Sequence, residues 1–201
     1  MTTGHQHREN SWRVLTKWRV RCFVSALLCF LLLPTATLPD TRKPTEFEVK
    51  AAYLFNFAKF VKWPSSIESE NDTFPMCVLG SDPFGPVLDS TVAGEKIGGR
   101  TVIVRRISSA SEAAKCRILF VSSAEQSRLG SIMAAVSRMP VLTVSDIDGF
   151  VDRQGVIEFV MDHDRVRFEV NLAAAEKAGL TLSSELLKVA TAVKRPGGSD
   201  R

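Results

Sequence analysis

The side chains that could do chemistry in this chain are few, and their spacing is poor for catalysis. His163 lies between Asp162 and Asp164, where a run of alternating apolar and polar residues is interrupted. A nucleophilic triad needs a histidine held beside a serine or cysteine, and three adjacent side chains point in different directions. The same divergence makes them a poor metal site, because zinc needs ligands that converge on one point. We interpret these residues as a solvated turn.

Two other segments superficially resemble ligand-binding loops. Aspartates between residues 146 and 152 precede Glu158, but apolar residues interrupt the alternate oxygen positions that a calcium loop requires. The turn over residues 80–85 lacks the Gly-Lys-Ser/Thr ending of a phosphate loop, and Asp82 would repel an anion. We therefore expect no catalytic residue, no metal and no cofactor, and we predict that the protein is not an enzyme.

The first 36 residues have the order of a secretory signal peptide. Five basic residues up to Arg21 precede an apolar run over residues 22–33, and residues 34–36 offer a small-residue cleavage site. The apolar run is about 12 residues, shorter than the roughly 20 that span a bilayer, and an uncleaved anchor is the alternative. We expect an exported protein cleaved near Ala36, followed by a linker over residues 37–44.

Removal of this leader changes the charge balance of the chain. The leader holds five of the 26 basic residues and one of the 22 acidic residues, which leaves 21 of each in the remainder. Nucleic acids and anionic membranes are recognised by basic stripes, and the remainder has none longer than Arg105 and Arg106. We expect neither nucleic-acid binding nor direct membrane insertion.

The cysteines predict one disulfide. Cys22 and Cys29 belong to the leader, so Cys77 and Cys116 remain, without the Cys-x-x-Cys spacing of a redox motif or zinc site. Two cysteines in an exported domain usually pair. Closing a loop of about 40 residues stabilises a fold by roughly 4 kcal/mol in the chain-entropy estimate.

An unusually apolar helix is the main element expected to position these groups. Thr45 and Glu48 form a capping box, and Pro64 ends the apolar pattern that starts at Lys50. A helix that is apolar around most of its circumference must be covered on more than one side. Either its own domain sandwiches this helix, or the helix is shared between the core and a partner or second copy.

Short apolar strands alternate with helices after this point. We expect strands over residues 74–79, 101–107, 117–121 and 141–144. Between them we expect a short helix that begins at Pro83 behind an Asp82 cap, a helical turn over 111–115 and a helix over 125–137 capped by Ser123. This alternation implies a largely parallel sheet, in which the strands at the two cysteines are neighbours.

The last third of the chain has a different pattern. Apolar residues alternate over 157–161 and again over 166–170, which predicts an antiparallel hairpin with one buried face. Helices over 172–177 and 185–193, the second capped by Ser184, would close the domain. The expected fold is therefore a single α/β domain over residues 45–193, with a mostly parallel sheet, helices on both faces and a C-terminal hairpin. Residues 194–201 are expected to form a flexible tail.

Several segments resemble the YfiR-like family of periplasmic proteins, in the family's order and over roughly residues 45–193. The motifs lie at residues 50–64, 78–84, 155–159, 166–171 and 179–184. The resemblance implies a periplasmic homodimer that represses a membrane-anchored diguanylate cyclase and whose activity depends on disulfide state. Family members with a second disulfide carry its cysteines before the 155–159 motif, but residues 143–155 contain no cysteine. The behaviour of that second pair is therefore not expected here.

Two sets of residues are candidates for recognition. The first is a partner or dimer interface of apolar side chains, for which core packing is the alternative: Tyr53, Phe57, Phe60, Trp63, Leu180 and Leu182. The second is a ligand groove on the polar face of the hairpin, for which a solvated, salt-bridged face is the alternative: Arg165, Arg167, Glu169 and Asn171.

Two functions from different classes fit these observations. The resemblance implies a regulatory protein that binds the periplasmic sensor domain of an inner-membrane diguanylate cyclase and lowers cyclic di-GMP signalling. The alternative is a periplasmic small-molecule-binding or sensor module that acts with a transporter or kinase, because parallel sheets form crevices at their strand ends. Such binding proteins usually have two lobes, whereas about 165 residues suit only one.

Overall fold

The computed structural model describes residues 42–65 and 72–196. The predicted signal peptide, most of the linker and the last five residues of the predicted tail lie outside the described residues. The described residues from Lys43 onward form one compact unit. Within the described residues, no helix is both long enough and apolar enough to cross a bilayer.

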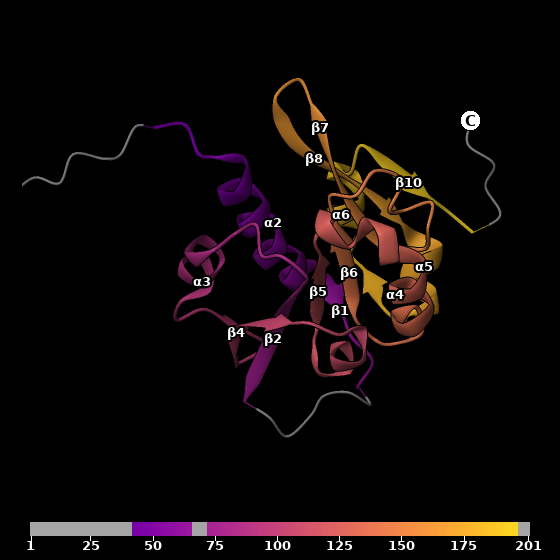
Figure 1. The fold of residues 1–201 in the computed structure, drawn as a ribbon, viewed down its shortest axis with the longest axis horizontal. Helices are drawn as coiled ribbons and strands as arrows, with labels where there is room; N and C mark the ends of the chain where they lie inside the picture. The colour runs from indigo at the N-terminus through magenta and orange to yellow at the C-terminus, as the bar shows by residue number, and fades with distance from the viewer. Residues whose placement is uncertain (1–41, 66–71, 197–201) are drawn as a thin grey trace, which may run out of the picture. The chain divides into compact units, whose positions relative to one another are not determined.

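The unit is built on an eight-stranded sheet in the order β10-β8-β7-β6-β5-β2-β4-β3 (Figure 1). Five neighbouring pairs are parallel, and only β3–β4 and β7–β8 are antiparallel. The predicted mostly parallel sheet is therefore confirmed. Its strands are β2 (Thr73–Leu79), β3 (Lys96–Ile97), β4 (Arg100–Ile107), β5 (Ile118–Val121), β6 (Leu142–Ser145), β7 (Ile157–Asp162), β8 (Arg165–Asn171) and β10 (Ala192–Lys194).

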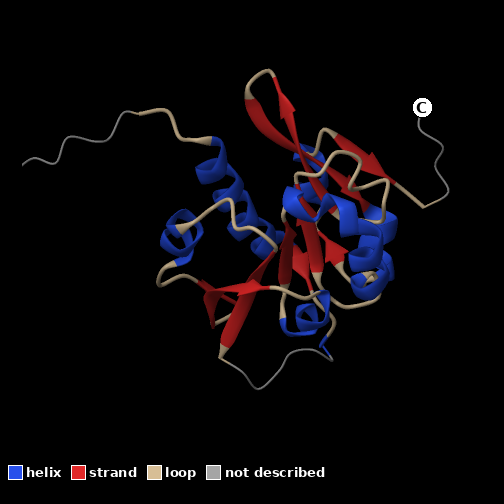
Figure 2. Cartoon of the chain, viewed as in Figure 1, coloured by secondary structure: helices blue, strands red, loops and turns tan. Residues whose placement is uncertain are grey.

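Helices cover both faces of this sheet (Figure 2). Alternate residues of β2 belong to different cores: Phe74 and Val78 pack with α2, whereas Cys77 packs with α4. A strand alternates its side chains between two faces, so this division follows from its geometry. The helices are α2 (Glu46–Phe60), α3 (Pro86–Val92), α4 (Leu129–Val136), α5 (Leu172–Lys177) and α6 (Ser184–Val189), with 3-10 turns η2 (Ala110–Lys115) and η3 (Ser123–Arg128).

Helix α2 starts with the predicted capping box. The Glu48 amide donates to Thr45 Oγ1, and the Thr45 amide donates to Glu48 Oε2 at 2.7 Å. The helix ends at Phe60, four residues before Pro64, because Val61 adopts an extended conformation. Strand β1 (Val61–Lys62) then pairs with β9 (Thr181–Leu182) in a separate small antiparallel sheet. A contact that is distant in sequence, rather than the proline, ends the helix.

The start of α3 differs from the expectation. This helix begins at Pro86 rather than Pro83, because Asp82 Oδ1 accepts a hydrogen bond from the Phe84 amide at 2.8 Å. That bond closes a turn, and Gly85, with a φ of 53°, precedes the helix. Asp82 is therefore a turn residue and not a helix cap.

The ends of the later helices also differ from the expectation. Ser122 and Ser183 are the N-caps of η3 and α6, each one residue earlier than predicted. The helix expected over 185–193 ends at Val189. Ala192–Lys194 instead forms β10, which pairs in parallel with β8, so Lys194 is part of the sheet and not of a tail.

The predicted hairpin is confirmed. Strands β7 and β8 pair in antiparallel register from Ile157 opposite Val170 to Asp162 opposite Arg165. The two residues between them, His163 and Asp164, have φ values of 46° and 59°. Two successive positive φ angles are typical of a type I′ turn, the tightest hairpin connection.

Candidate functional site

A groove lies between the N-terminal half of α2 and the β7–β8 hairpin. It has a volume of about 470 Å³, within the range of small-ligand sites. The groove combines apolar side chains with charged residues from both elements. Its lining residues are Lys43, Pro44, Glu46, Val49, Tyr53, Met161, Asp164, Arg165, Val166 and Arg167.

The helical wall of the groove packs against the core. Glu46, Val49 and Tyr53 lie on one face of α2, since residues three and four apart share a helical face. The Tyr53 ring packs edge-on against Phe168 at 5.5 Å between centroids and stacks on Phe57 at 5.7 Å. These contacts fix the tyrosine against the core while part of its surface remains accessible in the groove.

The lining of the groove contains more basic than acidic residues. Glu46 Oε1 lies 2.5 Å from Lys50 Nζ, but Lys50 also pairs with Asp146, so the charge of Glu46 is matched only in part. The lining as a whole holds three cationic residues, Lys43, Arg165 and Arg167, against two acids, Glu46 and Asp164. This balance favours acidic over basic groups in anything that enters the groove.

Lys50 connects the N-terminal half of α2 to the end of the sheet through an ion pair. Its side chain is 4% exposed, and Nζ lies 2.8 Å from Asp146 Oδ2 in the segment just after β6. The ammonium group also lies 5.1 Å from the centroid of the Phe47 ring. A buried lysine needs such partners because desolvation of an unpaired charge is costly. The aspartate that resembled a calcium ligand is thus a structural counter-ion.

The predicted groove residues divide into two pairs. Arg165 and Arg167 are among the residues that line the groove. Glu169 lies where β8 pairs with Ala192 of β10 and does not line it. Asn171 serves the fold: its Oδ1 accepts the Ala174 amide at the start of α5.

Most of the predicted interface residues are in the core. Phe57, Leu180 and Leu182 are buried, with at most 7% of their surface exposed. Trp63 is partly buried and packs edge-on against Phe74 at 5.2 Å. Phe60 is 38% exposed and is the member of the set that a partner could reach directly.

An exposed face of α2 continues from the groove to the end of the helix. Ala52, Asn56 and Phe60 are exposed, and Val49 and Tyr53 are partly so. The opposite side of the helix packs in the core, so its own domain covers most but not all of it. We call these five residues the α2 face.

Sequence reasoning named Tyr53 as an interface residue but missed Glu46 and Val49 on α2 and Met161 on β7 as groove residues. Val49 and Glu46 lie four and seven residues before Tyr53, a helical spacing that could have identified them. Met161 had no such signal. It is 54% exposed although it continues the apolar alternation of β7, because β7 there extends beyond the core.

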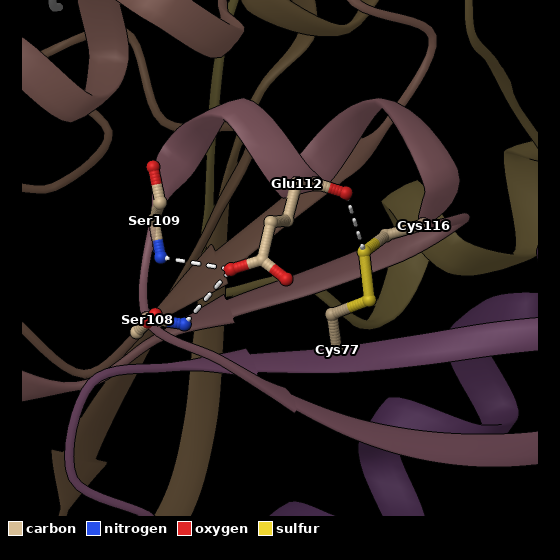
Figure 3. The surroundings of a disulfide bond; sticks show 5 residues. All are labelled: Cys77, Ser108, Ser109, Glu112 and Cys116. Carbon is tan, nitrogen blue, oxygen red and sulfur yellow. Dashed lines mark hydrogen bonds between the residues drawn. A yellow bond between two sulfur atoms is a disulfide. The ribbon is translucent and has the colours of Figure 1, made fainter.

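The predicted disulfide is present and joins Cys77 of β2 to Cys116 at the end of η2 (Figure 3). The neighbouring turn is held by Glu112, whose Oε1 accepts hydrogen bonds from the Ser108 and Ser109 amides. Strands β2 and β5 are parallel neighbours, as predicted, and this brings the two cysteines together. Both are 1% exposed, so the bond is inside the core and away from the groove.

Other motif residues support the turn over residues 147–153. Glu158 is buried and accepts hydrogen bonds from the Gly149 and Val151 amides at 2.9 and 3.0 Å. A Cβ atom at Gly155 would lie 2.1 Å from the Phe150 ring. These residues have packing roles rather than ligand-binding roles.

Comparison with known proteins identifies the family. The sequence profile of the YfiR/HmsC-like family matches residues 47–191. The chain belongs to the YfiR/HmsC-like family. This family is regulatory rather than catalytic, and its members are periplasmic regulators of diguanylate cyclase signalling. No curated protein matches this family member's sequence closely enough to count as a relative.

Solved structures share the fold of this YfiR/HmsC-like chain at low sequence identity. A conserved domain protein from Vibrio cholerae O1 biovar El Tor is 13% identical, with a TM-score of 0.53 over 75% of this chain and 60% of that one. The ABC domain in complex with L-Trp from Streptococcus pneumonia is 14% identical, with a TM-score of 0.50 over 71% of this chain and 60% of that one. Such likeness shows a shared α/β fold alone.

Proposed function

We propose that this protein binds the periplasmic sensor domain of an inner-membrane diguanylate cyclase and holds that enzyme in its inactive state. The observation that carries this proposal is the family match over residues 47–191, which spans nearly all of the described unit. The protein would reach the periplasm through the signal peptide predicted over residues 1–36, with cleavage near Ala36.

Repression of this kind is a shift of a conformational equilibrium. A repressor lowers cyclase activity only to the extent that it binds the inactive conformation more tightly than the active one. Each tenfold preference moves the equilibrium by about 1.4 kcal/mol. The protein therefore needs a surface that is specific for one arrangement of the sensor domain, not merely an adhesive patch.

The α2 face and the adjoining groove are our candidate for that surface. Phe60 supplies an exposed aromatic anchor at one end, and Tyr53 lies in the groove beside Arg165 and Arg167 at the other. Aromatic and arginine side chains dominate the energetics of protein interfaces. The predicted homodimer would use the same helix, with Phe60 and Trp63 as its contacts.

Deletion of the gene, with measurement of cellular cyclic di-GMP, tests the proposal. We expect a rise that is reversed by the exported protein and not by a version without residues 1–36. An unchanged cyclic di-GMP level, with the wild-type protein abundant in the periplasm, would contradict it.

The groove also favours a second candidate, a periplasmic small-molecule sensor. Its volume of about 470 Å³ and the guanidinium groups of Arg165 and Arg167 suit a ligand with a carboxylate group. A thermal-shift screen of amino acids, nucleotides and phosphate would reveal such a ligand as stabilisation that increases with concentration. Stabilisation without any change of cyclic di-GMP on deletion would favour this candidate over the repressor.

A further inference from the structure

Strand β8 is only half covered on its outer edge. Strand β10 pairs with the last three residues of β8, Glu169, Val170 and Asn171. Within the described residues, no strand pairs with the outer edge of residues 165–167. In Figure 1 this end of the hairpin projects past β10. This unpaired end of β8 contains Arg165 and Arg167, which also line the groove.

The hairpin geometry fixes which backbone groups face outward. In a two-residue hairpin the residues that flank the turn, Asp162 and Arg165, form a pair that exchanges both backbone hydrogen bonds. Bonding then alternates along β8, so Arg165 and Arg167 bond to β7 while Val166 and Phe168 face away from it. The Phe168 carbonyl accepts the Thr191 amide at 2.9 Å from the outer side, which agrees with this alternation.

The N–H and C=O groups of Val166 and the N–H of Phe168 therefore point away from β7 at the uncovered edge. Such groups are a template for an incoming strand. Asp164, Arg165, Val166 and Arg167 all line the groove, so the groove follows this edge. An incoming strand would have apolar Val49, Tyr53 and Met161 on one side and the two arginines on the other.

We propose that the outer edge of β8 binds an extended segment of the regulated partner, which adds to the sheet as a further strand. Its side chains would alternate between apolar residues, which enter the groove beside Val166, and acidic residues opposite Arg165 and Arg167. Cross-strand pairs of opposite charge stabilise strand pairing, and like charges directly opposite destabilise it. This proposal rests on the proposed function and names the chemistry of the partner.

A second copy of the chain fits this edge poorly. Symmetric antiparallel pairing of two β8 strands about Val166 places Arg165 of each copy directly opposite Arg167 of the other. Two such pairs would place like charges directly opposite each other, four guanidinium groups in all, although Asp162 lies opposite Arg165 on β7 and Glu46 and Asp164 line the groove. The charge pattern therefore favours an acidic partner over self-association at this edge.

Amide hydrogen exchange by NMR tests the proposal on the free protein and on its complexes. In the free protein the Val166 amide should exchange about tenfold or more faster than the Arg167 amide, because only the latter is bonded to β7. The purified periplasmic domains of the host's membrane diguanylate cyclases are the probes. With the one that binds, exchange at Val166 and Phe168 should slow by about tenfold or more, while Arg165 and Arg167 change little.

The outcomes separate this proposal from the function on which it rests. Binding of a cyclase domain without protection at Val166 overturns strand addition and leaves repression intact. Binding by none of the domains overturns both. Protection of Val166 that grows with the concentration of the protein alone shows a second copy at the edge and overturns the partner assignment.

Charge reversal provides a second measurement that does not depend on the exchange of single amides. Arg167→Glu should weaken binding of the cyclase domain by about tenfold or more, because an acidic segment would then meet a like charge. Arg138→Glu makes the same change of charge at an exposed position after α4, outside the groove lining, and should bind normally. Equal binding by both variants contradicts the acidic segment.

Discussion

Lys50 of α2 and Asp146, the residue after β6, are far apart in sequence but lie 2.8 Å apart between Nζ and Oδ2. The lysine side chain is 4% exposed, whereas its other acidic partner, Glu46, is 43% exposed. The pair with Asp146 is thus the less solvated of the two, and it fixes the helix that carries both the α2 face and one wall of the groove.

Removal of this counter-ion should destabilise the fold. Asp146→Ala leaves a buried ammonium with only an exposed partner, and we expect a loss of about 2 kcal/mol in the free energy of unfolding, measured by urea denaturation. Glu46→Gln, the matched control on the solvated partner, should cost less than about 1 kcal/mol. A larger loss for Glu46→Gln than for Asp146→Ala would contradict this assignment.

Loss of the disulfide should have a larger effect. The bond between Cys77 and Cys116 closes a loop with a sequence separation of 39 residues. The double variant Cys77→Ala, Cys116→Ala should lose roughly 4 kcal/mol, an upper figure from the chain-entropy estimate. Thermal unfolding with and without reductant measures this. An equal melting temperature for wild type and variant under oxidising conditions would contradict the role assigned to the bond.

Gly155 should not tolerate a side chain. Its added Cβ would lie 2.1 Å from Phe150 Cδ1, and Phe150 is fully buried. We expect Gly155→Ala to destabilise the protein by about 2 kcal/mol through overpacking, measured in chemical denaturation. Phe150→Leu in the same chain should recover part of that loss, whereas strictly additive losses would show that the two residues do not compete for space.

The Arg106 cluster should make a small, pH-dependent contribution. Its guanidinium bonds to Asp89 and Asp82, and the hydrogen bond from Arg106 lowers the pKa of Asp89 below its ordinary value. A lowered pKa gives stability that is present above the unfolded-state value and lost as the pH falls through the folded-state value. The side chains of Arg106 and Asp89 are both more than one-third exposed, so we expect their interaction to contribute about 0.5 kcal/mol to the free energy of unfolding.

The comparison of wild type with Arg106→Gln measures this contribution. The difference in their free energies of unfolding should be present at pH 7, shrink below pH 4 and decrease with added salt. A difference that grows as the pH falls would have the wrong sign for the interaction.

Local patterns in the sequence predicted much of this fold. The capping box at Thr45 and Glu48 joins residues three apart, and the alternation in β7 and β8 needs no other segment. The cysteine pairing followed from the expected order of parallel strands. The contact between Val61 and Leu182, which ends α2, and the pairing of β10 with β8 are long-range, so local propensity could not reveal them.

The site was less predictable for the same reason. Arg165 and Arg167 were identified because they alternate on one hairpin face, but the other wall of the groove comes from α2. Phe57, Leu180 and Leu182 were proposed as an interface, yet an apolar side chain has the same sequence signal whether it meets the core or a partner. The exposed fraction in the structure distinguishes the two: Phe60 is 38% exposed, whereas these three residues are buried.

A charge on the α2 face should leave the protein folded but weaken its binding to the partner. Phe60 is 38% exposed at the end of α2, so Phe60→Glu should change the free energy of unfolding by less than about 1 kcal/mol. The matched control, Ala135→Glu, places the same charge on an exposed position of α4, which packs in the other core. If Phe60→Glu unfolds the protein, Phe60 belongs to the core and not to the α2 face.

Calorimetric titration of the purified protein into the periplasmic domains of the host's membrane diguanylate cyclases tests repression by direct binding. We predict saturable binding to one of these domains, weakened about tenfold or more by Phe60→Glu and unchanged by Ala135→Glu. Absence of binding to every domain by folded, disulfide-bonded protein would contradict the account.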